Sequence, residues 1–500
     1  MLNEENIRII FGLKLRQLRQ ANELSTEQLA KLSKISVSYL NEIERGKKYP
    51  KTEKIIKLSN VLNVDYDDLV SLKLDEHLAP IGEMLNSQWL NDIPLSSFGI
   101  SLEKLVEIMF NAPTKAGAFI STLIQIAKNY EMRVEQFFFA ALRAYQEMNN
   151  NYFEDLEIAV DEFLKQQDIT YIPPISLEKL KETLIHTFQY TIDEQRLGEQ
   201  EELKEVRSVF VKKRNKNILL INDNLNSFQK AFQFGKEIAY QSLQLKERTV
   251  APTWLKINAF EQILNNYKAS YFSGALLIHR KHIVKNLRKA FQSKEWSSSV
   301  FSKMMLEYNV SPETFMHRLT NILPQYFGLD QLFFLRFSKK KDNPNFSITK
   351  ELHIPKQHSP HRNEINEHYC RRWIAVNVIK ELEKAQATSQ TNDIQPIVQV
   401  QRSLYIDSGN EYFCISVARA MYPTPDTNSS VTIGFLMNKE FKRKVKFWND
   451  PAIPVRLVNE TCERCRLTDC KQRVATPIVL ERQARIERIE TVLDEVTKGF

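Results

Sequence analysis

The stretch STEQLAKLSKISVSYLNEIERG, residues 25–46, decides the fold of the N-terminal part of this chain. Its first four letters form a capping box, in which the Ser25 side chain caps a helix and Gln28 reaches back to the Ser25 backbone. A three-residue turn over residues 33–35 follows this short helix. A second short helix comes next and stops at Gly46, a residue type that often ends helices. The stretch therefore predicts two short helices joined by a tight turn.

Apolar residues on both sides of this stretch predict a small helical core. They are Leu15, Leu18, Leu24, Leu29, Ala30, Ile35, Leu40, Ile43, Ile55 and Leu58. With this core, the cap, the turn and the segment IERGKKYP, residues 8–72 resemble the Cro/phage-repressor (Xre) family of helix-turn-helix proteins. The resemblance implies five short helices, with the second helix of the motif lying in the major groove of double-stranded DNA.

The resemblance also implies which side chains contact DNA. The second helix is expected to begin at Ser36, and the residues expected at base edges are Ser36, Val37, Ser38 and Asn41. Those expected at phosphates or elsewhere in this interface are Thr26, Gln28, Tyr39, Lys47 and Lys48. The alternative is that ERGKK is only a solvated helix end. Residues 1–60 hold 12 Lys/Arg and 7 Asp/Glu, which suits phosphate neutralisation. A DNA-binding domain this short needs two copies on a two-fold symmetric DNA site for specific binding, so we expect a homodimer.

The composition of the whole chain excludes several classes of protein. No apolar run approaches the ~18 residues that span a bilayer, and no secretory leader is visible, so we expect a soluble, cytoplasmic protein without a membrane partner. Five cysteines, an odd number, argue against a disulfide framework and leave thiols or metal ligands. With only 12 glycines, the chain has no glycine-rich nucleotide loop. The net charge of +8 permits nucleic acid binding without demonstrating it.

The periodicity of the remaining chain predicts a multidomain protein that is mostly α, with an α+β C-terminal half. Residues 80–170 are read as a helical linker and dimerisation region. Residues 171–320 mix helices with one short strand pair, and residues 321–500 hold strand-like segments that predict an antiparallel sheet. The last 25 residues are expected to form an amphipathic helix.

Two segments of residues 171–320 resemble IrrE/ImmA-like zinc metallopeptidases. The family's H-E-x-x-H helix matches residues 236–240, which read Lys-Glu-Ile-Ala-Tyr here, and its third, acidic ligand matches Lys268. Two cations and an aromatic ring would not hold Zn²⁺, so we expect a retained fold, no catalytic residues and no peptidase activity. The alternative is a coincidence between two amphipathic helices. His279 and His282 are interpreted as part of a solvated basic face.

The C-terminal region resembles the last module of bacterial short-chain fatty acyl-CoA transcriptional regulators. The resemblance is carried by SPETFMHRLTN (311–321), HYCRRW (368–373), EYFCISVAR (411–419) and CERCRLTDCKQRVATP (462–477). It implies an acyl-CoA effector and an iron–sulfur cluster associated with the cysteines.

A [4Fe–4S] cluster needs four thiolates that can converge. Cys462, Cys465 and Cys470 can do so locally, and Cys370 is the expected fourth ligand. Cys414 lies in a strand that reads as buried, where a lone cysteine is usually a small hydrophobe. Zinc bound by the same four thiols and a metal-free set of reduced thiols remain as alternatives.

An acyl-CoA carries phosphates, so its site should offer Arg or Lys beside an apolar slot. The expected ligand-binding residues are Arg371, Arg372, Trp373 and Arg419. These features together predict a one-component, DNA-binding transcriptional regulator that senses a short-chain acyl-CoA, and redox or iron status through its cysteines. The alternatives are an active IrrE/ImmA-like metalloprotease regulator and an iron–sulfur redox sensor without a metabolite ligand.

Overall fold

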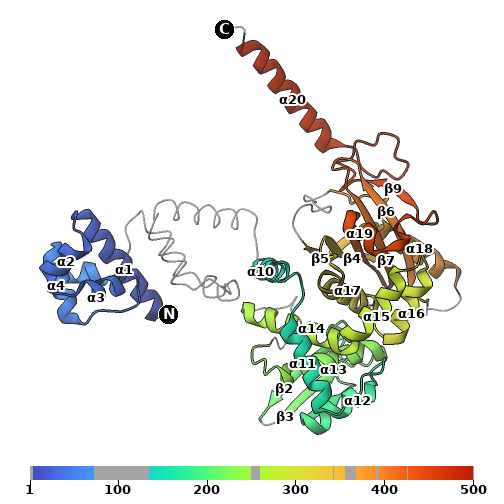
Figure 1. Cartoon of the computed structure of the whole chain (residues 1–500), viewed down its shortest axis with the longest axis horizontal. Coiled ribbons are helices and arrows are strands. Elements are labelled where there is room, and N and C mark those ends of the chain that lie inside the picture. Colours follow the sequence, from blue (N-terminus) through green and yellow to red (C-terminus); the bar gives the residue numbers. More distant parts are fainter. Residues whose placement is uncertain are drawn as a thin grey trace. The chain divides into compact units, whose positions relative to one another are not determined.

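The computed structural model describes residues 4–71, 134–214, 216–248, 259–341, 343–354, 367–389, 394–424 and 426–498. The chain divides into two compact units (Figure 1). One comprises Met1–Tyr145 with Asn258–Glu261, and the other comprises Gln146–Ile257 with Gln262–Phe500. Residues 80–133 of the predicted helical linker lie outside the described residues. Within the described ranges, no helix is both long and apolar enough to cross a membrane.

The N-terminal domain consists of five helices: α1 (Glu4–Ala21), α2 (Thr26–Ser33), α3 (Val37–Glu44), α4 (Thr52–Leu62) and α5 (Tyr66–Val70). The predicted core lies between them, with Leu18 and Leu24 partly buried at its edge. The first helix begins at Glu4, four residues before the expected boundary. The predicted turn is shifted by one residue, because Lys34 takes a left-handed backbone (φ 56°) and Ser36 caps α3 without joining it.

Two glycines and one ion pair fix α3 against α1. A Cβ atom at Gly12 would lie 2.3 Å from the Ile43 carbonyl oxygen, so only glycine permits this approach of the two helices. Gly46 ends the α3 segment with φ 68°, a conformation that favours glycine. The Arg19 guanidinium donates to both Glu44 carboxylate oxygens, at 2.6 and 2.9 Å. The orientation of α3 is therefore set from within the domain.

The described part of the predicted linker is helical, with α10 at Val134–Met148 and α11 at Glu154–Gln166. The middle region then contains α12 (Leu177–Glu182), the π-helix η2 (Thr183–Thr187), η3 (Glu201–Leu203), α13 (Ser227–Ser242), α14 (Phe260–Leu277), α15 (Arg280–Phe291), α16 (Ser298–Tyr308) and α17 (Pro312–Phe327). A buried ion pair joins α11 to α17, because Arg318 donates to both carboxylate oxygens of Glu157 at 2.5 and 2.9 Å.

A small three-stranded sheet accompanies these helices. The predicted strand pair is confirmed, as β2 (Ser208–Lys213) runs antiparallel to β3 (Lys216–Ile221). A third strand, β1 (Tyr190–Asp193), adds parallel to β3 and was not expected from the sequence. Helices α13 and α14 approach closely at Gly235, where a Cβ atom would lie 2.4 Å from Ser273 Oγ. This contact brings together the two helices that resemble the metallopeptidase motif.

The C-terminal region is built on a six-stranded sheet of order β5-β4-β8-β7-β6-β9. Its strands are β4 (Leu332–Lys340), β5 (Ser347–Ile354), β6 (Ile397–Tyr405), β7 (Glu411–Ala420), β8 (Thr427–Leu436) and β9 (Val455–Val458). All neighbours pair antiparallel except β6 and β9, which are parallel. The helix α18 (Ile374–Thr388) packs on the sheet and contributes much of the buried core. Two short helices, α19 (Lys439–Lys444) and η4 (Lys446–Asn449), precede β9.

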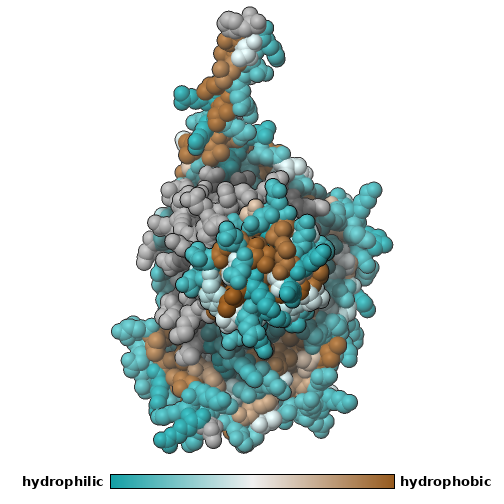
Figure 2. All heavy atoms as spheres, turned by 90° about the vertical axis from the view of Figure 1, so that its left-hand side faces the viewer, coloured by the Kyte–Doolittle hydropathy of each residue, from teal (hydrophilic) through white to brown (hydrophobic). Residues whose placement is uncertain are grey.

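The expected amphipathic helix at the end of the chain is α20, Ile478–Thr497. It has no buried residue, although six of its large apolar side chains are strongly exposed: Ile478, Ile486, Ile489, Val492, Leu493 and Val496. Figure 2 shows brown, apolar residues running along this helix at the top of the view.

Candidate functional site

The face that the sequence assigned to DNA is formed by the N-terminal half of α3. Ser36, Val37, Ser38 and Asn41 are exposed, while the intervening Leu40 is fully buried. The Ser36 hydroxyl accepts a hydrogen bond from the Tyr39 backbone N–H at 3.3 Å, so it also caps the helix. Four polar or small side chains thus project from one helix end that the domain core holds in place.

Lysines flank this helix end and stack on Tyr39. Lys54 Nζ lies 3.8 Å from the Tyr39 ring centroid, and Lys48 Nζ lies 5.6 Å from it. Lys48 also pairs with Glu42 at 2.9 Å, whereas Lys47 is exposed. Lys54 was missed in the sequence because it belongs to α4, thirteen residues beyond Asn41. Its contact with Tyr39 places a further cation beside the predicted phosphate contacts.

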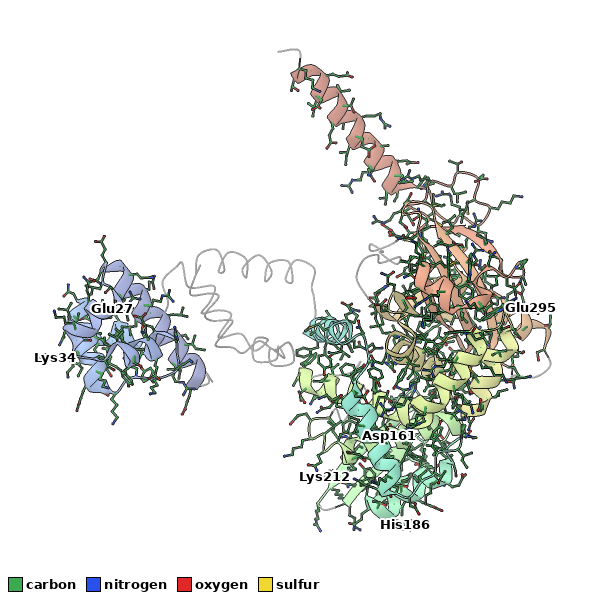
Figure 3. The ribbon with its side chains drawn as sticks, viewed as in Figure 1. Glu27, Lys34, Asp161, His186, Lys212 and Glu295 are labelled. Carbon is green, nitrogen blue, oxygen red and sulfur yellow. The ribbon has the colours of Figure 1, made fainter. Side chains whose placement is uncertain are left out.

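Two residues at the start of α2 have less freedom than the sequence suggested. Gln28 accepts a hydrogen bond from the Ser25 backbone N–H at 2.7 Å and closes the predicted capping box. Only its amide N–H groups remain for DNA. Thr26 is half-buried at the first position of the helix. Figure 3 shows Glu27 and Lys34 on the same part of the domain, at the start of α2 and just after its end.

In the helix that resembles the metallopeptidase motif, the glutamate forms an ion pair with an arginine. Glu237 is 5% exposed and accepts two hydrogen bonds from one Arg248 nitrogen, at 2.7 and 2.9 Å. The Arg248 guanidinium in turn lies 3.7 Å from the Phe210 ring centroid and 4.1 Å from that of Tyr240. Both oxygens of this carboxylate are thus engaged by a stacked cation.

The residues at the expected zinc-ligand positions are not grouped in one place. Lys236 Nζ donates to Asn266 Oδ1 at 2.7 Å, and Lys236 and Tyr240 line a common cavity. Lys268 does not line it; Asn266 and Ser270 of the same helix do. Of the three residues at the expected ligand positions, Lys268 therefore lies outside the wall of this cavity. Burial lowers the pKa of Lys236 to about 8.

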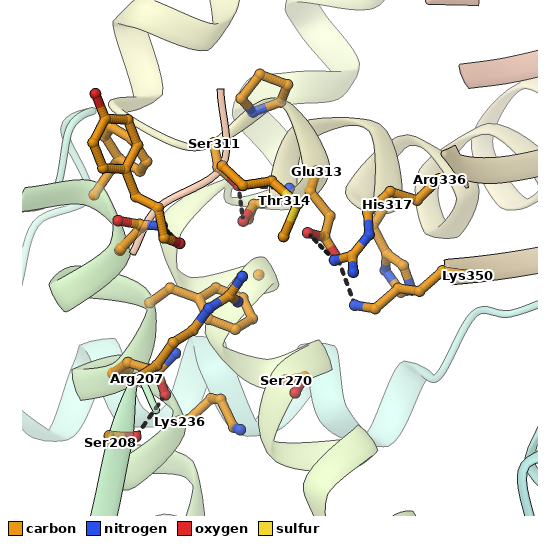
Figure 4. A pocket seen from close by; sticks show the side chains of 18 of the residues that line it. Arg207, Ser208, Lys236, Ser270, Ser311, Glu313, Thr314, His317, Arg336 and Lys350 are labelled. Atoms are coloured by element: carbon orange, nitrogen blue, oxygen red, sulfur yellow. Dashed lines mark hydrogen bonds and ion pairs between the residues drawn. The ribbon is translucent and has the colours of Figure 1, made fainter. Parts of the chain in front are cut away.

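The cavity above Lys236 has a volume of about 550 Å³ and is lined from the middle region and the C-terminal sheet. Figure 4 shows Arg207 and Lys236 on one side of it and Glu313, Arg336 and Lys350 on another. Seven Arg and Lys residues line it against three Glu: Arg207, Lys236, Arg248, Arg318, Arg336, Lys350 and Arg419, with Glu205, Glu237 and Glu313. Such a wall favours an anion of small-molecule size.

Not every cation of this wall is available to a ligand. Arg336 and Lys350 both pair with Glu313, at 2.9 and 2.5 Å. Burial works to raise the pKa of Glu313, but the charges of Lys350 and Arg336 outweigh it and hold the pKa well below the usual range. Arg207 and Lys236 have no carboxylate within ion-pair distance among the described residues. These two are the cations most open to an anionic ligand.

Aromatic and apolar side chains line the rest of the cavity. They include Phe210, Phe228, Phe232, Tyr240, Tyr271, Val417, Met421 and Val431. The Arg419 guanidinium lies 4.8 Å from the Phe228 ring centroid and so joins a strand of the sheet to α13. The cavity therefore combines cations with flat apolar surfaces, an arrangement that suits a phosphorylated ligand with a ring or a hydrocarbon part.

The interpretation of His279 as a solvated residue is wrong. His279 is buried, its ring nitrogen lies 2.7 Å from an Asp161 oxygen, and burial lowers its pKa. Asp161 belongs to α11, as labelled in Figure 3, so the start of α15 packs on that helix. His282 lies 3.0 Å from the Tyr308 hydroxyl and is partly exposed.

The cysteines form a second, much smaller cavity. Cys370, Cys462, Cys465 and Cys470 all line it, at a volume of about 10 Å³. The backbone holds the two segments together, because Cys370 N–H donates to Glu460 O at 3.1 Å and Cys462 N–H donates to His368 O at 2.9 Å. Cys414 stays in β7 and does not line this cavity.

Arg473 fixes the loop that carries three of these cysteines. Its guanidinium donates to the carbonyl oxygens of Cys462 at 2.7 Å, Cys465 at 2.8 Å and Leu467 at 2.6 Å. In the structure this arginine satisfies backbone carbonyls of the loop. These bonds fix the shape of the loop, and the backbone bonds at Cys370 and Cys462 hold it next to Cys370.

The donor chemistry of the cysteine cavity suits a metal, since four cysteines from two segments line it. The side chains are not grouped as ligands, however: across the described ranges, no three His, Cys, Asp or Glu residues are placed to hold a metal ion. Burial raises the pKa of the Cys370 thiol to about 11, so this thiol is neutral when no metal is bound. The backbone brings the four cysteines to one cavity, but their side chains are not arranged as metal ligands.

The four predicted acyl-CoA residues do not form one site. Arg419 lines the large cavity, whereas Arg371 and Arg372 line the cysteine cavity. Trp373 is 4% exposed and packs in the core of the C-terminal region, so it is not available to a ligand. The prediction that Trp373 binds a ligand relied on its position near Cys370 in the sequence. It is wrong because the start of α18 places the Trp373 side chain in the buried core. Arg207 and Lys236 were missed as ligand-binding candidates, since nothing near them in sequence indicates a shared cavity.

Comparison with known proteins agrees with two parts of this geometry. The helix-turn-helix family matches residues 15–69, and the IrrE N-terminal-like domain of the M78 peptidase family matches residues 198–320. Control protein C.BamHI of Bacillus amyloliquefaciens is 38% identical over 66 residues, which are 13% of this chain and 82% of that protein. The uncharacterized HTH-type transcriptional regulator RghRB of Bacillus subtilis (strain 168) is 45% identical over 62 residues, 12% of this chain and 45% of RghRB.

The matched segment thus spans less than half the length of RghRB. Among solved structures, a Mycobacterium tuberculosis transcriptional regulator is similar at 17% identity with a TM-score of 0.45, covering 68% of this chain and 93% of that one. On the strength of its N-terminal domain, the chain belongs to the helix-turn-helix family of DNA-binding transcriptional regulators.

Proposed function

We propose that this chain is a cytoplasmic, one-component regulator that binds an operator as a homodimer and takes a short-chain acyl-CoA as its effector in the large cavity. The observation that carries the proposal is the lining of that cavity, where seven cations face three carboxylates beside several aromatic rings. A coenzyme A thioester carries a pyrophosphate and a 3′-phosphate for the cations. Its adenine and acyl chain would occupy the apolar walls.

The effector would act by differential affinity. Residues of the middle region and of the C-terminal sheet share the cavity wall, so a ligand between them stabilises one arrangement of these elements over others. By linkage, an operator that is bound better in the same arrangement raises the affinity for the effector by an equal factor.

Calorimetric titration with acetyl-CoA, propionyl-CoA and free coenzyme A tests the proposal. We expect Arg207→Glu to weaken acyl-CoA binding by about tenfold to a hundredfold, because a phosphate partner is replaced by a like charge. The matched control is Arg288→Glu, which makes the same charge change at an exposed position of α15 outside the cavity wall. Equal binding of free coenzyme A would remove the acyl specificity, and no binding of any of the three would refute the effector.

We also propose that the four thiols of the small cavity hold a [4Fe–4S] cluster, which would add a response to redox or iron status. Cys370, Cys462, Cys465 and Cys470 would be its ligands, and the cluster would supply one-electron chemistry. Anaerobic purification followed by iron, sulfide and zinc analysis tests this. Cys370→Ser should lose the cluster, while Cys414→Ser, in β7, should keep it. Zinc in place of iron would favour a structural metal site. No metal in the unsubstituted chain would favour a thiol switch.

We propose further that the IrrE-like region has no peptidase activity. The support is the ion pair of Glu237 with Arg248 and the presence of Lys236 and Tyr240 at ligand positions. Stoichiometric zinc that persists when all five cysteines are replaced, together with zinc-dependent proteolysis, would instead favour the metalloprotease alternative.

A further inference from the structure

The exposed apolar residues of α20 recur at the spacing of a coiled coil. Ile486, Ile489, Leu493 and Val496 are separated by three, four and three residues, and each is 48–56% exposed. In a heptad written abcdefg, they occupy successive a and d positions. The preceding heptad has Val479 at a and Arg482 at d. Five of the six seam positions in this helix are therefore apolar.

No described element of the chain covers this seam. The helix makes local hydrogen bonds only, apart from its first turn, where Val479 N–H donates to Glu463 O at 3.2 Å. A helix of twenty residues that leaves its apolar stripe largely exposed is marginal in water, and it gains stability by burying that stripe against a partner helix.

The charges beside the seam point to a second copy of the same helix. Position g holds Arg485, and the e position five residues later holds Glu490. In a parallel, in-register pair, g of one helix faces the following e of the other, so each Arg485 meets the Glu490 of the opposite helix. Neither side chain makes a hydrogen bond or an ion pair with another described residue. The other g and e positions hold no charge: Ile478, Val492, Gln483 and Thr497.

We propose that α20 forms a parallel two-stranded coiled coil with α20 of a second copy of this chain. The seam consists of Val479, Ile486, Ile489, Leu493 and Val496, flanked by two symmetric Arg485–Glu490 pairs. This inference assigns a dimer interface to the proposed homodimer. It rests on the proposed function only where that function requires two copies of the chain on DNA.

Sedimentation equilibrium of the full chain gives the first test. Ile489→Asp would bury two facing carboxylates in the seam, so the dissociation constant of the dimer should rise about a hundredfold or more. Because Ile489 is exposed in the single chain, this variant is expected to fold. The matched control is Thr491→Asp on the outer face of α20, which should change the constant by less than about twofold.

A charge exchange tests the pairing. Arg485→Glu alone and Glu490→Arg alone should each weaken the dimer by about threefold to tenfold, and the double variant should restore it. Oxidation of Val496→Cys should link two chains through the seam only if the helices are parallel and in register. The unsubstituted chain, with its five native cysteines, is the reference for this experiment.

The outcomes separate this inference from the proposed function. A dimer that survives Ile489→Asp, or a monomeric native chain at micromolar concentration, overturns the coiled coil and leaves the seam to a different protein or to another part of this chain. Failure of the charge exchange or of the Val496→Cys link overturns the parallel register. A chain that dimerises through α20 but binds no operator would instead refute the proposed regulator.

Discussion

The helix-turn-helix domain and the large cavity use charged side chains in opposite ways. In the domain, Lys47 and Lys48 are exposed, and the most buried ion pair described there, Arg19 with Glu44, serves to fix α3. In the cavity, cations from segments as far apart as Arg207 and Arg419 line one hollow. The first arrangement suits a partner larger than the domain, and the second suits a ligand small enough to be surrounded.

The largest effect is expected at the ion pair that supports the cavity. Both side chains of the Glu157–Arg318 pair are 1% exposed, so Glu157→Ala leaves an uncompensated buried guanidinium. We expect a loss of about 3–5 kcal/mol in the free energy of unfolding, measured by denaturant titration. The control is Glu154→Ala, whose carboxylate pairs with Arg280 but is 54% exposed, and it should cost less than about 1 kcal/mol. Equal costs would show that the buried pair carries no special role.

The equivalent pair in the helix-turn-helix domain should have a slightly smaller effect. Its side chains are 11% and 7% exposed, and Glu44→Ala should destabilise the domain by about 2–3 kcal/mol. Because the pair joins α1 to α3, DNA affinity should fall with stability, while acyl-CoA binding should not change. Glu42→Ala, which removes the exposed pair with Lys48, serves as the control for stability. An unchanged melting temperature in Glu44→Ala would contradict this account of α3.

The difference between base and phosphate contacts can be measured on the exposed face. Asn41→Ala should weaken binding to a selected operator by about 1–3 kcal/mol and relax its sequence preference. Lys47→Ala should weaken binding to all sequences alike and lower the slope of log affinity against log salt by about one. The measurement is fluorescence anisotropy at several salt concentrations. If the two variants behave identically, the assignment of Asn41 to base edges is wrong.

The smallest effect concerns the protonation of the cavity. Burial lowers the pKa of Lys236 to about 8, so its positive charge is lost as the pH rises through that value. Anion affinity should therefore fall by about tenfold between pH 7 and pH 9. In Lys236→Met the same pH change should have little effect, and a retained pH dependence would assign it to another group.

Much of the fold could be predicted from the sequence where the signals are local. The Ser25 cap, the Gly46 stop and the amphipathic pattern of α20 each depend on residues within a few turns of one helix. The strand pair β2–β3 joins residues that are close in sequence and was predicted for the same reason. The strand β1 was not, because its partner β3 lies more than twenty residues away and pairs with it in parallel.

The candidate sites also differ in whether their residues are close together in the sequence. The exposed face of α3 follows from a motif of about twenty residues, so its side chains were predicted together. The acyl-CoA residues were chosen because Arg371, Arg372 and Trp373 are neighbours in sequence, yet the start of α18 buries Trp373 and separates all three from Arg419. Adjacent residues on a chain face different directions, and only the packing of α18 decides which.

The sequence by itself determined the helix-turn-helix domain, the mismatch at the metallopeptidase ligand positions and the apolar seam of α20, since each follows from residue type at fixed local spacing. The tertiary structure alone decided that Arg207 and Lys236 share a cavity with Arg419, that Glu237 is paired with Arg248, and that Cys370 lies against the 462–470 loop. These are contacts between segments distant in sequence. They depend on how the helices and the sheet pack, which no local pattern specifies.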